Sequence, residues 1–140
     1  MRKKIVICIA VAAVLLLLGI VWYRMPVSLP TADSEDIGRI YIFDGRTGKS
    51  ADIRESWKIE RIVEDLKGVT LKREGISLGY MDVGLRITLY DASGKEVRGW
   101  SKFKIKDAGN IRKDPFFYRV VGGEIDLTYI ESLLKKMEKQ

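Results

Sequence analysis

The feature that most constrains this chain is an uncharged apolar segment close to its start. Residues 5–22 form a run of 18 positions without a charged side chain. Coiled into an α-helix with a rise of about 1.5 Å per residue, the run spans roughly 27 Å, close to the thickness of a bilayer's hydrocarbon core. A helix also satisfies its backbone hydrogen bonds internally, which lipid requires. The run therefore predicts a transmembrane helix over residues 5–23.

The charges that flank the run predict its orientation. Arg2, Lys3 and Lys4 precede it, and Arg24 is the one basic residue that closely follows it. Because basic residues are retained on the cytoplasmic side, residues 1–4 are expected in the cytoplasm and the chain beyond Arg24 outside. The sequence thus predicts a single-pass protein of the cell membrane with an extracytoplasmic domain.

A cleaved signal peptide is the alternative interpretation of the same segment. The run is longer than the apolar region of about 7–15 residues in signal peptides, and no clean A-x-A cleavage site follows it. A cut after Ala32 would place Pro30 at the third position before the cut, and Cys8, preceded by Ile7, does not fit a lipoprotein signal. Either interpretation exports the rest of the chain, and we expect an uncleaved signal anchor.

The composition excludes several classes of chemistry. The chain contains no histidine and one cysteine, which removes the usual general base, disulfides within the chain and cysteine-cluster metal sites. The phosphate-binding glycine motifs, the G-x-S-x-G turn and the calcium-loop spacing are missing too. No pattern selects a pair of carboxylates or a Ser–Lys dyad. We therefore predict no catalytic residues, no metal, no cofactor and no enzymatic activity.

The net charge of +6 comes partly from the residues before the run. Without Arg2, Lys3 and Lys4, the 25 Lys and Arg residues fall to 22, against 19 Asp and Glu. This small excess does not indicate a nucleic-acid partner, and neither does an exported location.

The remaining sequence predicts one α+β domain. Residues 24–37 are rich in proline, small polar residues and acids, as is typical of a tether, and residues 38–140 form the extracytoplasmic domain. The expected strands are 39–44, 49–53, 69–74, 82–91, 95–106 and 116–121. The expected helices are 55–67 and a last one capped by Asp126, and 107–115 is expected to be a loop. This β-β-α-β-β-β-β-α order predicts an antiparallel sheet with two helices packed on one face.

Both expected helices have one apolar face at helical spacing. These faces consist of Ile59, Ile62, Val63 and Leu66 in the first helix, and Leu127, Ile130, Leu133, Leu134 and Met137 in the second. The alternation along 82–91 points Val83, Leu85, Ile87 and Leu89 inward. A turn that ends in Gly94 then reverses the chain, so 82–91 and 95–106 form the clearest hairpin.

The outward face of this hairpin is the candidate interaction site. The residues expected on it are Arg86, Tyr90, Arg98, Trp100, Lys102, Lys104 and Lys106. Cations around an exposed tryptophan fit an anionic surface, such as phospholipid headgroups, an anionic envelope polymer or an acidic partner protein. The alternatives are a solvated strand whose lysines discourage edge pairing, and a Trp100 that packs under a neighbouring loop.

Several turn and core motifs carry a resemblance to a known group of proteins. They are Asp44-Gly45-x-x-Gly48, Ile59-x-x-Ile62-Val63-x-x-Leu66, Leu89-Tyr90-Asp91 before Gly94, and Phe117-Tyr118 before Gly122-Gly123-x-Ile125-Asp126. With the N-terminal anchor, residues 38–138 resemble the small extracytoplasmic domains of unknown function of Gram-positive bacteria, which are often membrane-anchored or lipoproteins. The resemblance implies an exported location and an α+β fold, and it supplies no catalytic residues. This chain lacks the lipobox of the lipoprotein members.

The predicted function is binding at the bacterial cell envelope without covalent chemistry. The ligand would be an anionic envelope polymer, the membrane or a protein partner. The alternative is an accessory subunit of a larger membrane complex, docked through its transmembrane helix by the small residues within 10–13 and Gly19.

Overall fold

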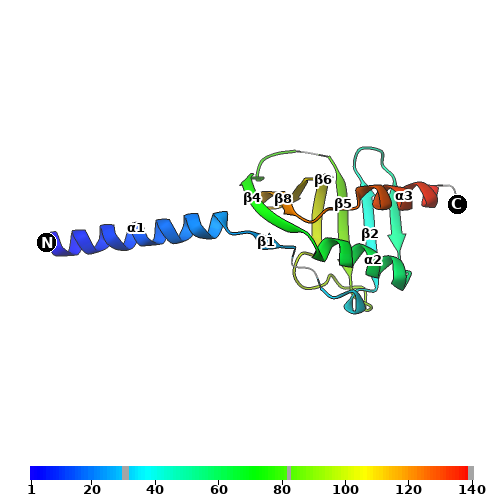
Figure 1. Ribbon diagram of the computed structural model, residues 1–140, viewed down its shortest axis with the longest axis horizontal. Coiled ribbons are helices and arrows are strands. Elements are labelled where there is room, and N and C mark those ends of the chain that lie inside the picture. The colour runs from blue at the N-terminus through cyan, green and yellow to red at the C-terminus, as the bar shows by residue number, and fades with distance from the viewer. Residues whose placement is uncertain (30–31, 82, 139–140) are drawn as a thin grey trace.

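A long helix and a curved sheet make up most of the molecule (Figure 1). The computed structural model describes residues 1–29, 32–81 and 83–138, with the backbone alone for 136–138. Asp82, where the sequence predicted a strand to begin, lies outside the described residues, as do Pro30 and Thr31 of the expected tether.

The N-terminal helix α1 (Arg2–Arg24) projects away from the rest of the chain (Figure 1). Every residue of α1 is described, and none of them is buried. The helix is long and apolar enough to cross a membrane, which makes it compatible with a signal anchor or a signal peptide.

Eight antiparallel strands form one sheet in the order β1-β4-β8-β7-β6-β5-β2-β3. The strands are β1 (Val27–Ser28), β2 (Arg39–Asp44), β3 (Ser50–Ile53), β4 (Thr70–Ile76), β5 (Leu85–Tyr90), β6 (Lys102–Asp107), β7 (Asn110–Lys113) and β8 (Phe116–Gly122). Each strand pairs with neighbours that run in the opposite direction. Side chains alternate between the two faces along each strand, and residues directly opposite one another on neighbouring strands lie on the same face.

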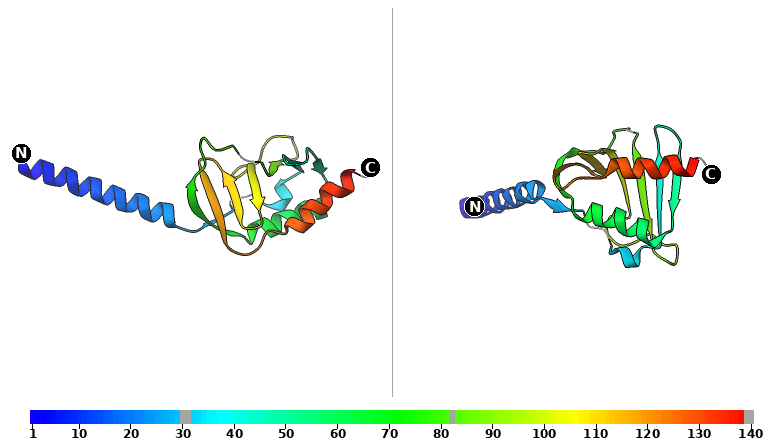
Figure 2. Two further views of the ribbon diagram at one scale, coloured as in Figure 1. Left: turned by 90° about the horizontal axis from the view of Figure 1, so that it is seen from above. Right: turned by 45° about the vertical axis from the view of Figure 1, so that its right-hand side comes forward.

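Two helices cover one face of this sheet (Figure 2). These are α2 (Ser56–Lys67) and α3 (Leu127–Glu138), and a short helix η1 (Ser34–Asp36) precedes β2. Asp126 caps α3, because its side chain accepts the backbone N–H of Tyr129 at 3.1 Å. The predicted α+β class, with an antiparallel sheet and two packed helices, is confirmed.

The core lies between the sheet and the two helices. The apolar stripe of α2 is buried as predicted, and Ile130, Leu133 and Leu134 of α3 are buried with it. Leu127 is partly buried, and the side chain of Met137 lies outside the described residues. Val83 is exposed, contrary to its predicted inward position, because β5 begins two residues later.

Two segments differ from the expected elements. The expected loop 107–115 contains β7, which pairs with both β6 and β8. Within the expected strand 95–106, only the residues from Lys102 onward form a strand, which is β6. Residues 91–101 form a turn and an irregular connection, in which Gly99 has φ +84° and a bridge joins Tyr90 to Glu96. A positive φ interrupts a pleated strand, so the alternation does not continue through Gly99.

The segment expected to be a tether is part of the folded domain. Val27 and Ser28 pair with β4, and Leu29 and Ile37 are buried. Asp33 forms an ion pair with Lys67 at the end of α2. These contacts form because the segment contains apolar residues that the sheet and α2 bury. The connection between α1 and β1 is therefore short and consists of Met25 and Pro26.

Candidate functional site

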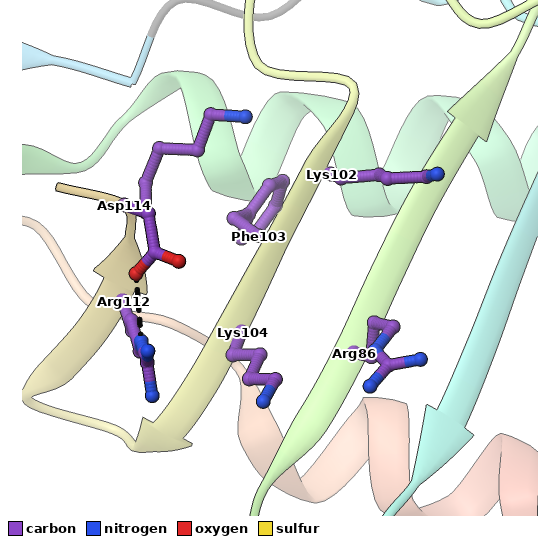
Figure 3. Close-up of a pocket in the computed structure, with 7 residues that line it drawn as sticks. Arg86, Lys102, Phe103, Lys104, Arg112 and Asp114 are labelled. Atoms are coloured by element: carbon purple, nitrogen blue, oxygen red, sulfur yellow. Dashed lines mark hydrogen bonds and ion pairs between the residues drawn. The ribbon is translucent and has the colours of Figure 1, made fainter. Parts of the chain in front are cut away.

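A row of basic residues crosses the face of the sheet that is turned away from the helices. Arg86 of β5 lies opposite Lys104 of β6, and Lys104 lies opposite Arg112 of β7. Neighbouring strands are about 4.8 Å apart, so the three residues stand side by side. Figure 3 shows Arg86 and Lys104 projecting from one side of the strands, with the helices behind the other side. We call Arg86, Lys104 and Arg112 the basic row.

Aromatic residues extend the basic row at both ends. Phe43 of β2 lies opposite Arg86, and Phe117 of β8 lies opposite Arg112. The row therefore continues over five adjacent strands with three cations in the middle. Like charges directly opposite one another weaken a sheet slightly, so an arrangement of this kind gains from an anion between its members.

A shallow hollow of about 240 Å³ opens at the basic row (Figure 3). It is lined by Arg86, Lys102, Phe103, Lys104, Arg112, Lys113 and Asp114. The ring of Phe103 belongs to the core, since Phe103 is buried and lies opposite Ile87. The lining therefore supplies five cations and one carboxylate.

Two carboxylates interact with these cations and are stabilised in their charged form. Asp114 Oδ1 accepts hydrogen bonds from Ser77 Oγ at 2.6 Å and Arg112 Nε at 2.9 Å, and these bonds hold the pKa of Asp114 below its usual value. Glu96 accepts from Lys102 Nζ at 2.8 Å, which lowers the pKa of Glu96 and raises that of Lys102. Both carboxylates are therefore ionised at neutral pH.

The residues predicted for the interaction face do not all come together. Arg86, Lys102 and Lys104 line the hollow. Lys106 lies at a register shift, with its Nζ 5.0 Å from the centre of the Phe117 ring. Tyr90 lies further along β5, where the guanidinium of Arg39 is 5.0 Å from its ring.

Arg98 and Trp100 are not part of a strand face. Both belong to the irregular connection between β5 and β6. The sequence predicted Trp100 on the outward face of the hairpin, and this prediction is wrong. Its ring lies 4.8 Å from the Tyr118 ring and 6.2 Å from the Phe103 ring, and it packs against the core. The alternative interpretation is correct in that Trp100 packs, and the rings beside it are those of Tyr118 and Phe103.

Reasoning from the sequence missed Arg112 of the basic row and the two aromatic residues that flank the row, Phe43 and Phe117. Arg112 was assigned to a loop because its strand has four residues with one apolar side chain, Ile111. The pairing of β6 with β7 is what places Arg112 beside Lys104. A pairing partner, which the local sequence does not reveal, was needed to find this residue.

The chemistry available at the row is electrostatic attraction and hydrogen-bond donation to an anion. Among the described residues, no three His, Cys, Asp or Glu side chains are grouped so as to hold a metal ion. Comparisons of the chain with protein-family models, curated proteins and solved structures found no match. The resemblance to small extracytoplasmic domains therefore stays a prediction.

Proposed function

We propose that the chain is a single-pass membrane protein whose domain binds a phosphate-bearing polymer of the cell envelope. In this proposal α1 is an uncleaved anchor, its N-terminus is cytoplasmic and the sheet domain lies outside the cell. The flanking charges and the length of α1 support this topology.

The observation that carries the proposal is the position of Arg86, Lys104 and Arg112 at one level of three adjacent strands. Cations that project from adjacent strands, whose backbones are about 4.8 Å apart, can contact a single phosphate group together, or successive charges of a polymer. The shallow hollow leaves one side of a bound group in solvent, as a long polymer requires. Aromatic residues at the ends of the row give apolar surface for the carbon backbone between phosphates.

Binding without covalent chemistry fits the groups around the hollow. A general base works best when its pKa lies near the working pH. Asp114 lines the hollow, and its pKa is lowered by Ser77 and Arg112. A carboxylate of this kind stays ionised and contributes charge rather than proton transfer.

Binding of poly(glycerol phosphate) to the full-length protein in phosphatidylcholine nanodiscs tests the proposal by calorimetry. Arg86→Glu and Lys104→Glu should each weaken binding by about tenfold or more, because each reverses a contacting charge. Lys135→Glu is the matched control, since Lys135 is exposed on α3 across the sheet and the net charge changes equally. This control should bind as the unaltered protein does.

Equal affinity of Arg86→Glu and the unaltered protein would contradict the proposal, and so would an equal loss in Lys135→Glu. Phosphatidylglycerol in the nanodisc separates a second source of the same chemistry. If lipid headgroups occupy the row, this lipid should weaken polymer binding; if the polymer is the ligand, affinity should change little at physiological salt.

A further inference from the structure

Large apolar side chains are exposed at the end of β4 and in the loop that follows it. Ile76, Leu78 and Tyr80 are 61%, 61% and 64% exposed, and Met81 is fully exposed. Residues 75–81 carry no charge. Clustered apolar side chains of this size on a surface are typical of contact with a membrane or another apolar partner. We call Ile76, Leu78, Tyr80 and Met81 the apolar loop.

Hydrogen bonds to the neighbouring part of the chain fix the backbone of this loop. Ser77 is fully buried, its N–H donates to the carbonyl of Pro115 at 2.8 Å and its hydroxyl donates to Asp114. Arg112 donates to the carbonyls of Tyr80 at 2.8 Å and Ser77 at 3.2 Å. These bonds hold the backbone of the loop in place while its apolar side chains stay exposed, and the Tyr80 ring lies 5.6 Å from the Phe117 ring.

The residues at the tip of the loop form a tight turn that suits their sequence. Tyr80 N–H donates to the carbonyl of Ser77 at 3.2 Å, which closes a four-residue turn. Gly79 has φ +86° at the third position of this turn, where a type II turn requires a positive φ. Leu78 therefore occupies the second position of the turn, where its apolar side chain is exposed and gains no stabilisation from contact with water.

The apolar loop starts beside the end of α1. Ile76 lies opposite Phe116 in the sheet, and the Phe116 ring is 5.9 Å from the Trp22 ring and 5.7 Å from the Tyr23 ring. Figure 1 shows the end of β4 on the side of the domain that faces α1. Trp and Tyr at the end of a membrane helix favour the level of the lipid headgroups. The start of the loop therefore lies beside the part of α1 that is expected at the membrane surface.

We propose that the apolar loop is a second membrane contact, which inserts Leu78, Tyr80 and Met81 into the interface of the bilayer that α1 crosses. The inference rests on the proposed anchoring of α1. Continuity with the end of α1 favours the bilayer as the occupant, because the loop begins at Ile76, whose strand partner Phe116 packs against Trp22. An uncharged loop with aliphatic and tyrosine side chains fits this interface.

Spin labels on the full-length protein in vesicles of phosphatidylcholine and phosphatidylglycerol test this contact. In a Cys8→Ala background, labels are placed by Leu78→Cys, Met81→Cys, Leu16→Cys and Thr47→Cys, one at a time. Leu16 reports on the middle of α1, and Thr47 on the exposed β2–β3 turn at the opposite edge of the sheet. Collisions with oxygen and with a water-soluble nickel complex measure the depth of each label.

Labels at positions 78 and 81 should have a higher collision rate with oxygen than the label at position 47. Their collision rate with the nickel complex should be lower than at position 47 by at least about threefold. Nickel accessibility equal to that at 47, with position 16 buried in lipid, overturns the loop contact and leaves the anchor intact. A label at 16 that is also exposed to water overturns both. Leu78 and Met81 are exposed outside the core, so thermal unfolding of both variants should match the background.

Discussion

Arg112 is the residue that connects the basic row with the apolar loop. Its side chain is 12% exposed, and its guanidinium donates to Asp114 and to the carbonyls of Ser77 and Tyr80. This geometry uses the planar fork of arginine, which can reach several acceptors at once. Arg112 therefore positions the loop, and Arg86 and Lys104 are better placed to contact an added anion.

The role of Arg112 can be measured with Arg112→Lys, which keeps the charge and removes the fork. Lost hydrogen bonds from a charged donor reduce local stability by about 1.5–3 kcal/mol. Amide hydrogen exchange in residues 77–81 should therefore become roughly tenfold faster or more, because loop opening costs less. Arg86→Lys is the control and should leave this exchange unchanged. An unchanged rate in Arg112→Lys would mean that other bonds hold the loop.

At the scale of elements, the close contact of β5 with β6 depends on Gly84. A Cβ atom added at Gly84 would lie 2.7 Å from the carbonyl oxygen of Ile105, which is shorter than real contacts allow. Gly84→Ala should therefore push the two strands apart and lower the free energy of unfolding by about 1–3 kcal/mol.

Gly109→Ala is the matched control for Gly84→Ala. A Cβ atom at Gly109 would lie 3.5 Å from its nearest neighbour, Asp107 Oδ1, and Gly109 has no positive φ. Gly109→Ala should therefore change the free energy of unfolding by no more than about 0.5 kcal/mol. Urea unfolding measures both variants, and equal stability of the two would show that β6 moves without cost.

The elements with strong local patterns could be predicted from the sequence. Each helix has an apolar stripe long enough to identify, and β5 alternates over its whole length. β7 was missed because Asn110–Lys113 contains one apolar residue, and its pairing on both sides stabilises it instead. Trp100 was placed on the wrong side because the alternation was continued through Gly99, whose φ of +84° ends it. The basic row depends on the β6–β7 register, which is a long-range property.

At the scale of the whole molecule, side chains connect α1 with the sheet domain. Arg73 of β4 donates from Nη1 to the carbonyl of Trp22 at 2.9 Å, and its guanidinium lies 3.8 Å from the centre of the Trp22 ring. Phe116 packs against the rings of Trp22 and Tyr23. With two residues between α1 and β1, these contacts set the angle between the helix and the domain, and thereby the height of the apolar loop.

Removal of the Arg73 guanidinium should loosen this connection. In Arg73→Gln the cation–π contact disappears, so the domain should swing about Met25 and Pro26. Electron–electron distance measurements between labels at Leu18→Cys and Thr47→Cys, in a Cys8→Ala background in nanodiscs, report the angle. The distance distribution should be narrow in the background and clearly broader in Arg73→Gln. Lys72→Gln is the control, since Lys72 is the adjacent residue of β4 on the other face, paired in register with Arg119. A distribution of unchanged width in Arg73→Gln would show that the aromatic rings and β1 suffice to hold the domain on α1.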